Sequence, residues 1–162
     1  MKRRITKIGI FAAITVCLTA QYACNFNVLY DKAVDIPKGL WSINNPVAFA
    51  FPITDTQSPY SIIFTMRNNN NYPYSNLFVF VDTQSPDGHS RRDTVEVTLA
   101  DIKGKWLGKG IGGIWQNKYY FRKNIRFPQP GEYKVKISQA MRDKNLEGII
   151  DVGIKVEPFK QD

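Results

Sequence analysis

The pattern that decides the fold lies in residues 76–99, which read NLFVFVDTQSPDGHSRRDTVEVTL. The first run, NLFVFVDT, is apolar on both faces, as in a central strand that is covered on both sides. Asp87 and Gly88 mark a tight turn, and the run TVEVTL then alternates apolar with polar residues. Two such runs joined by a turn of this composition predict a β-hairpin.

Further runs of the same kind extend from Trp41 to the end of the chain. They are separated by turn residues and read PVAFAFPI, YSIIFTMR, KYYFRKNIRF, GEYKVKIS and GIIDVGIKVE. The one candidate helix, Ser138 to Gly148, is short, ends in glycine and fits a compact loop equally well. About seven or eight strands with almost no helix predict an all-β fold, a two-sheet antiparallel β-sandwich. Immunoglobulin-like and jelly-roll-like topologies are both compatible with this pattern.

The start of the chain has the three parts of a secretory signal peptide. Four basic residues precede an uncharged apolar run over residues 8–20, and small residues follow it. A bilayer span needs roughly 20 apolar residues, so we expect cleavage rather than a permanent transmembrane helix. Cleavage directly before Cys24 would remove Cys17, leave no disulfide, and make Cys24 the N-terminal residue with an acylated thiol. The alternative is cleavage after Ala20, which would leave Cys24 as a free thiol.

Four segments follow from this interpretation: a lipoprotein signal peptide (1–23), a lipidated tether (24–38), a β-sandwich domain (39–158) and a C-terminal tail (159–162). The signal peptide holds four of the 22 basic residues and none of the 14 acidic ones, so the net charge of +8 falls to +4 in the mature chain. Half of the basic excess therefore belongs to targeting, and we expect no nucleic-acid partner.

The motifs associated with catalysis and cofactors are weak in this chain. GKGIGG, residues 108–113, fits the G-x-G-x-x-G pattern, but an aromatic strand-like run follows it where a nucleotide site needs a helix. His89 is the only histidine and lies beside the predicted exposed turn, and the several Cys and His ligands of a zinc site are missing. We therefore predict a non-enzymatic protein with no cofactor and no metal.

Residues 91–126 hold nine basic residues against three acidic ones, with aromatic residues interleaved. Outside the cytoplasm such a segment suits an anionic envelope polymer, a lipid head group or an acidic protein. The alternative is that the lysines are solvated and the aromatics cap the core. A second unusual stretch, NNNNYPYSNLF, offers tyrosines that either form a contact patch or lie flat over the rim of the sandwich. The candidate contact residues are Tyr72, Tyr74, Lys105, Trp106, Lys109 and Trp115.

Several stretches together with Cys24 resemble the GldH family of gliding-motility lipoproteins of the Bacteroidetes. They are YPYSNLFVFV, SPDG, RDTVEVTLAD, GKWLGKGIGG, FPQPGEYKVKISQAMRD and LEGIIDVGIKVE, in an order that spans about residues 24–157. The resemblance implies a palmitate-bearing envelope lipoprotein, anchored in a membrane and needed for gliding in motile relatives. It also implies protein partners in the motility machinery that is tied to type IX secretion.

Only Cys24 carries over from the family as a residue with a defined role, lipid attachment. Gln21 departs from the usual lipobox, which has an aliphatic residue there. The residues after the cysteine, Asn25-Phe26-Asn27, carry no acid, which favours a periplasm-facing domain, on the outer rather than the inner membrane. A second hypothesis is a glycan- or peptidoglycan-binding sandwich module of the envelope that displays the tryptophans and tyrosines named above.

Intact-mass analysis of protein extracted from membranes tests the anchor. We expect a chain that begins at Cys24 and carries acyl chains, because two or three buried chains at about 0.8 kcal/mol per methylene hold a protein firmly on a bilayer. A chain with a bare residue 24, or one that begins at Gln21, would contradict the prediction.

Overall fold

A computed structural model describes residues 28–161 of the chain. The predicted signal peptide and Cys24 lie outside these residues. The described part contains no α-helix, and one short 3-10 helix (Pro37–Gly39) follows the first strand. No helix in this part is long and apolar enough to cross a membrane.

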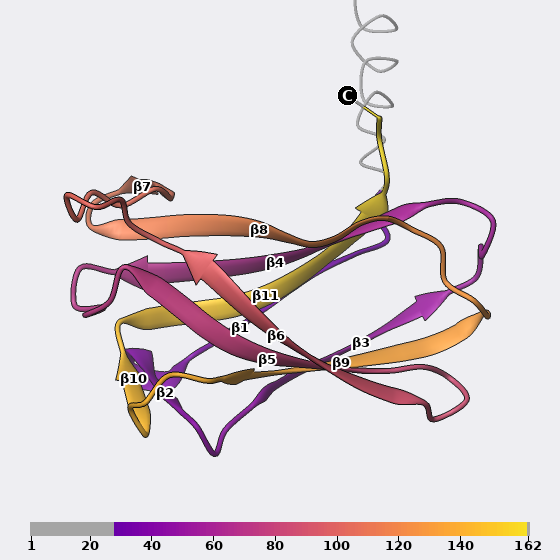
Figure 1. The fold of residues 1–162 in the computed structure, drawn as a ribbon, viewed down its shortest axis with the longest axis horizontal. Helices are drawn as coiled ribbons and strands as arrows, with labels where there is room; N and C mark the ends of the chain where they lie inside the picture. Colours follow the sequence, from indigo (N-terminus) through magenta and orange to yellow (C-terminus); the bar gives the residue numbers. More distant parts are fainter. Residues whose placement is uncertain (1–27, 162) are drawn as a thin grey trace, which may run out of the picture.

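Two antiparallel sheets face each other across one apolar layer (Figure 1). The five-stranded sheet has the order β1 (Tyr30–Asp35), β11 (Ile149–Pro158), β4 (Tyr60–Asn69), β8 (Ile114–Ile125) and β7 (Lys109–Ile111). The four-stranded sheet has the order β3 (Val47–Ile53), β9 (Gly131–Gln139), β5 (Asn76–Gln84) and β6 (Ser90–Thr98). A small third sheet pairs β2 (Leu40–Ser42) with β10 (Asn145–Glu147).

The strand orders distinguish between the two topologies that the sequence left open. Leaving aside the short strands β2, β7 and β10, the chain places β1, β4, β8 and β11 in one sheet and β3, β5, β6 and β9 in the other. Each sheet mixes early and late strands, so that β11 lies between β1 and β4 and β9 lies between β3 and β5. This is the order of a double-sheet jelly roll. The predicted all-β sandwich is confirmed.

Alternation of buried and exposed residues builds the core as the sequence predicted. In β3, Val47, Phe49, Phe51 and Ile53 are buried while the residues between them are exposed. In β5, three residues are almost fully buried, at most 2% exposed: Leu77, Val79 and Val81. The opposite face of β5 differs from the prediction of a strand covered on both sides, because its phenylalanines are only half-buried on the outside of the four-stranded sheet.

The predicted tether is partly a strand. Residues 30–35 pair with β11 over the register Tyr30–Val156 to Asp35–Asp151, and the backbone N–H of Leu29 donates to Val156 O at 2.9 Å. The sequence indicated at most a single pairing near residues 28–30, because all but the first residue of YDKAVD are exposed and show no hydrophobic period. Its pairing at a sheet edge comes from backbone hydrogen bonds, which leave no hydrophobic period in the sequence.

The candidate helix at residues 138–148 is a strand end, a loop and a short strand. β9 continues to the fully buried Gln139, whose side chain holds the loop that follows. Its Nε2 donates to Asp143 O at 2.6 Å, and its Oε1 accepts from the backbone N–H of Met141 at 2.8 Å. One buried amide thus replaces the hydrogen bonds that a helix would have supplied.

Gly148 joins β10 to β11 where two chain segments nearly touch. Its φ is +83°, and a Cβ there would meet Tyr72 at backbone N and, at 2.7 Å, at Cα. We expect Gly148→Ala to lower the free energy of unfolding by at least about 2 kcal/mol, because left-handed strain and a clash with backbone add together. Urea denaturation measures the loss.

The matched control is Gly88→Ala, since Gly88 has nearly the same φ, +86°, but nothing within 4 Å of its Cβ position. We expect this change to cost only about 1 kcal/mol, the strain alone. Equal losses at the two positions would show that the close approach of Gly148 to Tyr72 does not matter.

Candidate interaction surface

The basic segment 91–126 forms one side of the sandwich. It runs through β6, at the edge of the four-stranded sheet, and then through β7 and β8, at the edge of the five-stranded sheet. We call this the open side. Its nine basic residues against three acidic ones give +6, while residues 28–90 have three against five and residues 127–161 have six against five. The positive excess of the domain therefore belongs to the strands and turns of this side, although Arg92 pairs with Asp82 on the outer face of the four-stranded sheet.

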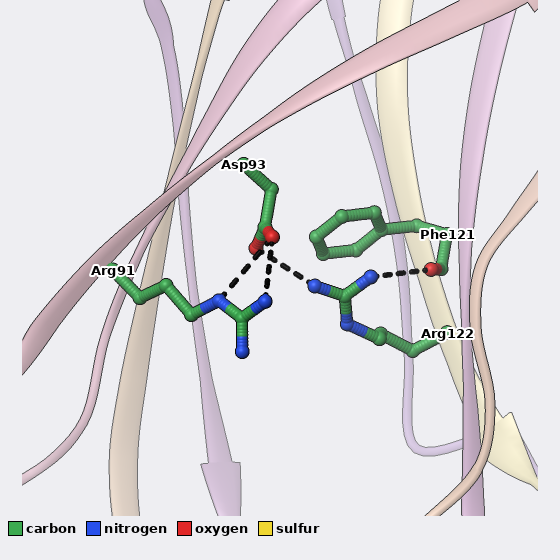
Figure 2. A network of polar contacts seen from close by, with 4 residues as sticks. All are labelled: Arg91, Asp93, Phe121 and Arg122. Carbon is green, nitrogen blue, oxygen red and sulfur yellow. Dashed lines mark hydrogen bonds and ion pairs between the residues drawn. The ribbon is translucent and has the colours of Figure 1, made fainter.

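An ion-pair network connects the two sheets on the open side (Figure 2). Asp93 on β6 accepts from Arg122 Nη2 on β8 at 2.8 Å and from Arg91 Nη2 at 2.9 Å. Arg122 also donates to Phe121 O at 3.2 Å, and its guanidinium carbon lies 4.2 Å from the centre of the Phe121 ring. Because Asp93 and Arg122 are only 17% and 34% exposed, this contact is better shielded than an ordinary surface ion pair.

Irregularities in β8 put Arg122 in reach of the opposite sheet. The register with β4 shifts between Ile62 and Ile63 and again between Tyr60 and Ile62, as expected for two β-bulges. Asn124, at the second of them, has a φ of +53°, a conformation that asparagine tolerates better than most residues. Each extra residue reverses which side chains point inward, so Arg122 faces the space between the sheets.

A groove of about 330 Å³ lies between β6 and β8. It is lined by Val97, Thr98, Leu107, Gly108, Lys109, Gln116, Asn117, Lys118 and Tyr119. Asn117 is buried and donates to Asn68 Oδ1 at 2.9 Å. A backbone hydrogen bond from Leu107 to Leu99 O, 2.9 Å long, joins the segment after β6 to the segment before β7. Two lysines and no acid line the groove, so it favours an anionic or polar ligand.

Two of the six predicted contact residues, Tyr72 and Tyr74, belong to an aromatic cluster at one end of the sandwich. Tyr72 is 3% exposed and donates to Asn76 O at 2.7 Å. Burial, followed by the nearby Tyr74 and Asp143, raises the pKa of Tyr72 well above its usual range. Tyr74 is half-buried and donates to Asp143 Oδ2 at 2.7 Å.

The tryptophans are likewise engaged inside the molecule. Trp106 is half-buried against the core, with its ring centre 6.3 Å from that of Tyr72. Trp115 donates from its indole N–H to Asn70 Oδ1 at 2.9 Å and is half-buried. Lys105 and Lys109 are exposed. The structure thus brings the lysines and Trp115 to the open side but uses Tyr72 mainly as a core residue.

Sequence reasoning missed a hollow of about 490 Å³ on the outer face of the four-stranded sheet. Small Ala48 and Ala50 on β3 lie beside Lys136 and Lys134 on β9, and Asp82 on β5 completes the row. Hydrogen bonds from Arg92, 2.6 and 3.0 Å long, hold the pKa of Asp82 below its usual value. The available signal in the sequence was the pair of small residues, Ala48 and Ala50, on the outward face of this strand.

The weaker motifs take structural roles. GKGIGG forms β7 and the turn into β8, where Gly112 and Gly113 have φ of +62° and +82°. His89 is exposed at the β5–β6 turn, and its backbone N–H donates to Asp87 Oδ1 at 3.1 Å. No group of three potential metal ligands occurs within residues 28–161.

Comparison with known proteins places the chain among lipoproteins. Residues 28–156 match the family described as GldH lipoprotein. The gliding motility lipoprotein GldH homolog of Christiangramia forsetii is 35% identical over 142 residues, which are 83% of this chain and 86% of that protein. The gliding motility lipoprotein GldH of Flavobacterium johnsoniae is 32% identical over 161 residues, which are 95% of this chain and 98% of that protein.

Solved structures give only distant likenesses. CBM35 from Cellvibrio japonicus is 13% identical with a TM-score of 0.34, and the match covers 82% of this chain and 100% of that one. The VP2 subviral particle of infectious bursal disease virus is 14% identical with a TM-score of 0.34 and covers 80% of this chain and 30% of that one. At this TM-score neither likeness bears on function.

The Asp93–Arg122 contact is expected to hold the open side together. We predict that Asp93→Asn lowers the free energy of unfolding by about 1 kcal/mol, because two guanidinium groups lose a charged acceptor. A double-mutant cycle of Asp93→Asn with Arg122→Gln, followed by urea denaturation, measures the coupling. Arg91→Gln is the control, since Arg91 is 73% exposed and should contribute little. A coupling of zero would contradict the prediction.

Proposed function

Since the chain belongs to the GldH lipoprotein family, as its sequence predicted, we propose that it is a non-enzymatic accessory component of the gliding motility machinery associated with type IX secretion. Of the two named relatives, one is a gliding motility lipoprotein and the other a homolog of it, and each matches most of this chain. The observation that carries the role is the open side, whose segment 91–126 holds nine basic residues against three acidic ones and borders a groove between the two sheets. A surface so uneven in charge suits recognition of an anionic partner.

The arrangement of polar groups supports binding rather than catalysis. The single histidine is exposed at a turn, whereas a general base needs a neighbour to orient it. Asp93, a carboxylate of the open side that is only 17% exposed, already accepts from two arginines. The groove itself has amide, hydroxyl and ammonium groups but no carboxylate.

We place the lipid anchor at Cys24, on the periplasmic side of the outer membrane. Leu29, where the described chain joins β11 through its first backbone hydrogen bond, is the fifth residue after Cys24. A fully extended tether of this length reaches about 17 Å. The sandwich would therefore remain next to the bilayer, and its open side would meet proteins of the envelope machinery there.

Crosslinking and affinity purification from native membranes test the proposal. We expect envelope proteins of the motility and secretion machinery to co-purify with the wild-type chain. The groove variant Lys109→Glu/Lys118→Glu should lose them, because it reverses both charges that line the groove.

The variant Lys144→Glu/Lys160→Glu makes the same charge change away from the groove and serves as the control. Equal recovery of partners with the groove variant would contradict the assignment of the open side. Absence of any motility or secretion protein from the wild-type sample would contradict the proposed role.

A glycan-binding module is the second candidate, and the hollow on the four-stranded sheet favours it. The hollow presents Asp82, Gln84, Ser90, Lys134 and Lys136, polar groups of the kind that bind sugar hydroxyls and carboxylates. Titration calorimetry with soluble peptidoglycan fragments would detect binding, and Lys134→Glu/Lys136→Glu should abolish it. Loss of binding in a Trp106→Ala or Trp115→Ala variant instead would move the glycan site to the open side.

A further inference from the structure

Two turns at one end of the open side display aliphatic side chains to solvent. Ile102 is 103% exposed in the turn after β6, and Ile111 is 91% exposed at the end of β7. Leu107 and Ile114, between and after them, are 58% and 40% exposed. Figure 1 shows the two turns at the same end of the sandwich, at the left of the view beside β7. We call these residues the aliphatic tips.

The turns are ordered by their own backbone and not by the isoleucines. Asp101 Oδ1 accepts from the backbone N–H groups of Lys103 and Lys105, both at 2.9 Å, and Asp101 O accepts from Gly104 at 2.9 Å. Ile111 pairs with Ile114 across two glycines of positive φ, which fits a type I′ hairpin turn. An almost fully exposed isoleucine gains little from folding. Two of them on ordered turns at one end of the molecule, with the partly exposed Leu107 and Ile114 between and after them in the chain, form an apolar group that is available for a contact outside the domain.

Lysines surround the aliphatic tips. Lys103 and Lys105 flank the first turn and Lys109 begins β7, and all three are exposed. The nearest acid in sequence, Asp101, is occupied by the backbone of its own turn. The end of the open side therefore combines exposed apolar side chains with an excess of positive charge, three lysines against one aspartate. These are the two contributions that bind peripheral proteins to anionic bilayers.

We propose that the aliphatic tips insert into an anionic phospholipid surface while Lys103, Lys105 and Lys109 contact its phosphate groups. A lipid surface suits the tips better than a protein pocket does. The side chains project from two separate turns. A stable protein interface, in contrast, buries about 800 Å² on each partner between surfaces of matched shape. A bilayer has no fixed shape that a ligand must match, so single side chains can insert into it.

The geometry allows the anchor and the tips to reach one membrane. This step rests on the proposed attachment at Cys24. The tether joins the sheet at Tyr30 of β1, which aligns through Val156 and Ile62 with Arg122 of β8, whereas the tips lie at the other end of β8, where Ile114 pairs with Asn69. The two places are about 23 Å apart along the strands and about 14 Å apart across the sheet. The tips and the anchor therefore meet one bilayer when the long axis of the sandwich lies along the membrane. A domain held this close to lipid docks effectively even when its isolated affinity for the surface is weak.

Vesicle flotation of the mature chain carrying Cys24→Ser tests the docking without the anchor. We expect binding to vesicles of phosphatidylethanolamine and phosphatidylglycerol, weaker binding at high salt, and none to phosphatidylcholine. Ile102→Ser/Ile111→Ser should lower the partition coefficient at least about tenfold, given the free energy of burying an aliphatic side chain. Lys103→Glu/Lys109→Glu should lower it similarly. Leu40→Ser is the control, since Leu40 is 47% exposed on β2.

A fluorescent label distinguishes insertion from attraction by charge alone. The Cys24→Ser mature chain has no other cysteine, because Cys17 lies in the signal peptide, so Ile111→Cys can be labelled at one site with an environment-sensitive dye. We expect a blue shift on anionic vesicles at residue 111 and none at a control label on Leu40→Cys. Unchanged melting temperatures of all variants would show that the changes act at the surface.

Three results would overturn the proposal: no flotation with anionic vesicles, undiminished flotation of the isoleucine variant, or no shift of the label at residue 111. None of them bears on the anchor, because the tested chain has no lipid. Conversely, a bare Cys24 in native membranes would refute the anchor and leave the vesicle result unaffected.

Discussion

Burial of alternate side chains between the two sheets is the interaction on which the other features depend. Because successive residues of a strand point to opposite faces, each position that faces the core also fixes its neighbours on the outside. Val47, Phe49 and Phe51 hold β3 against the opposite sheet and thereby turn Ala48 and Ala50 outward, where they form part of the hollow. The residues on the outer faces of the two sheets are therefore largely those that alternate with core residues along each strand.

The sides of the sandwich, where strands of different sheets meet, are held together by other interactions. At the open side, β6 and β8 belong to different sheets, so the inter-strand hydrogen bonds within each sheet do not join them; β7 covers only the first residues of β8. The side chains of Asp93 and Arg122 connect β6 with β8 at one place. At another, a backbone hydrogen bond from Leu107 to Leu99 O joins the segment after β6 to the segment before β7. The groove between these two connections is the space that β6 and β8 leave open, and Lys109 and Lys118 line it.

The two proposals divide the open side between two tasks. The groove, with Lys109 and Lys118, suits a protein of the envelope machinery, and the aliphatic tips suit the lipid on which the protein is anchored. Lys109 takes part in both, since it lines the groove and begins β7 next to the tips. Docking of the tips would hold the groove at a fixed height above the membrane, which restricts the partners that can reach it.

The sequence by itself determined the all-β class, the hairpin at residues 76–99, most core positions and the family, because these depend on period two, turn composition and local motifs. It missed β1, whose exposed residues have no hydrophobic period, and it did not choose between two sandwich topologies. Only the tertiary structure decided that Tyr72 belongs to the core, that Arg122 meets Asp93, and that residues 91–126 form one side of the molecule. These features depend on which strands become neighbours, and pairing between strands far apart in sequence leaves no mark within either strand.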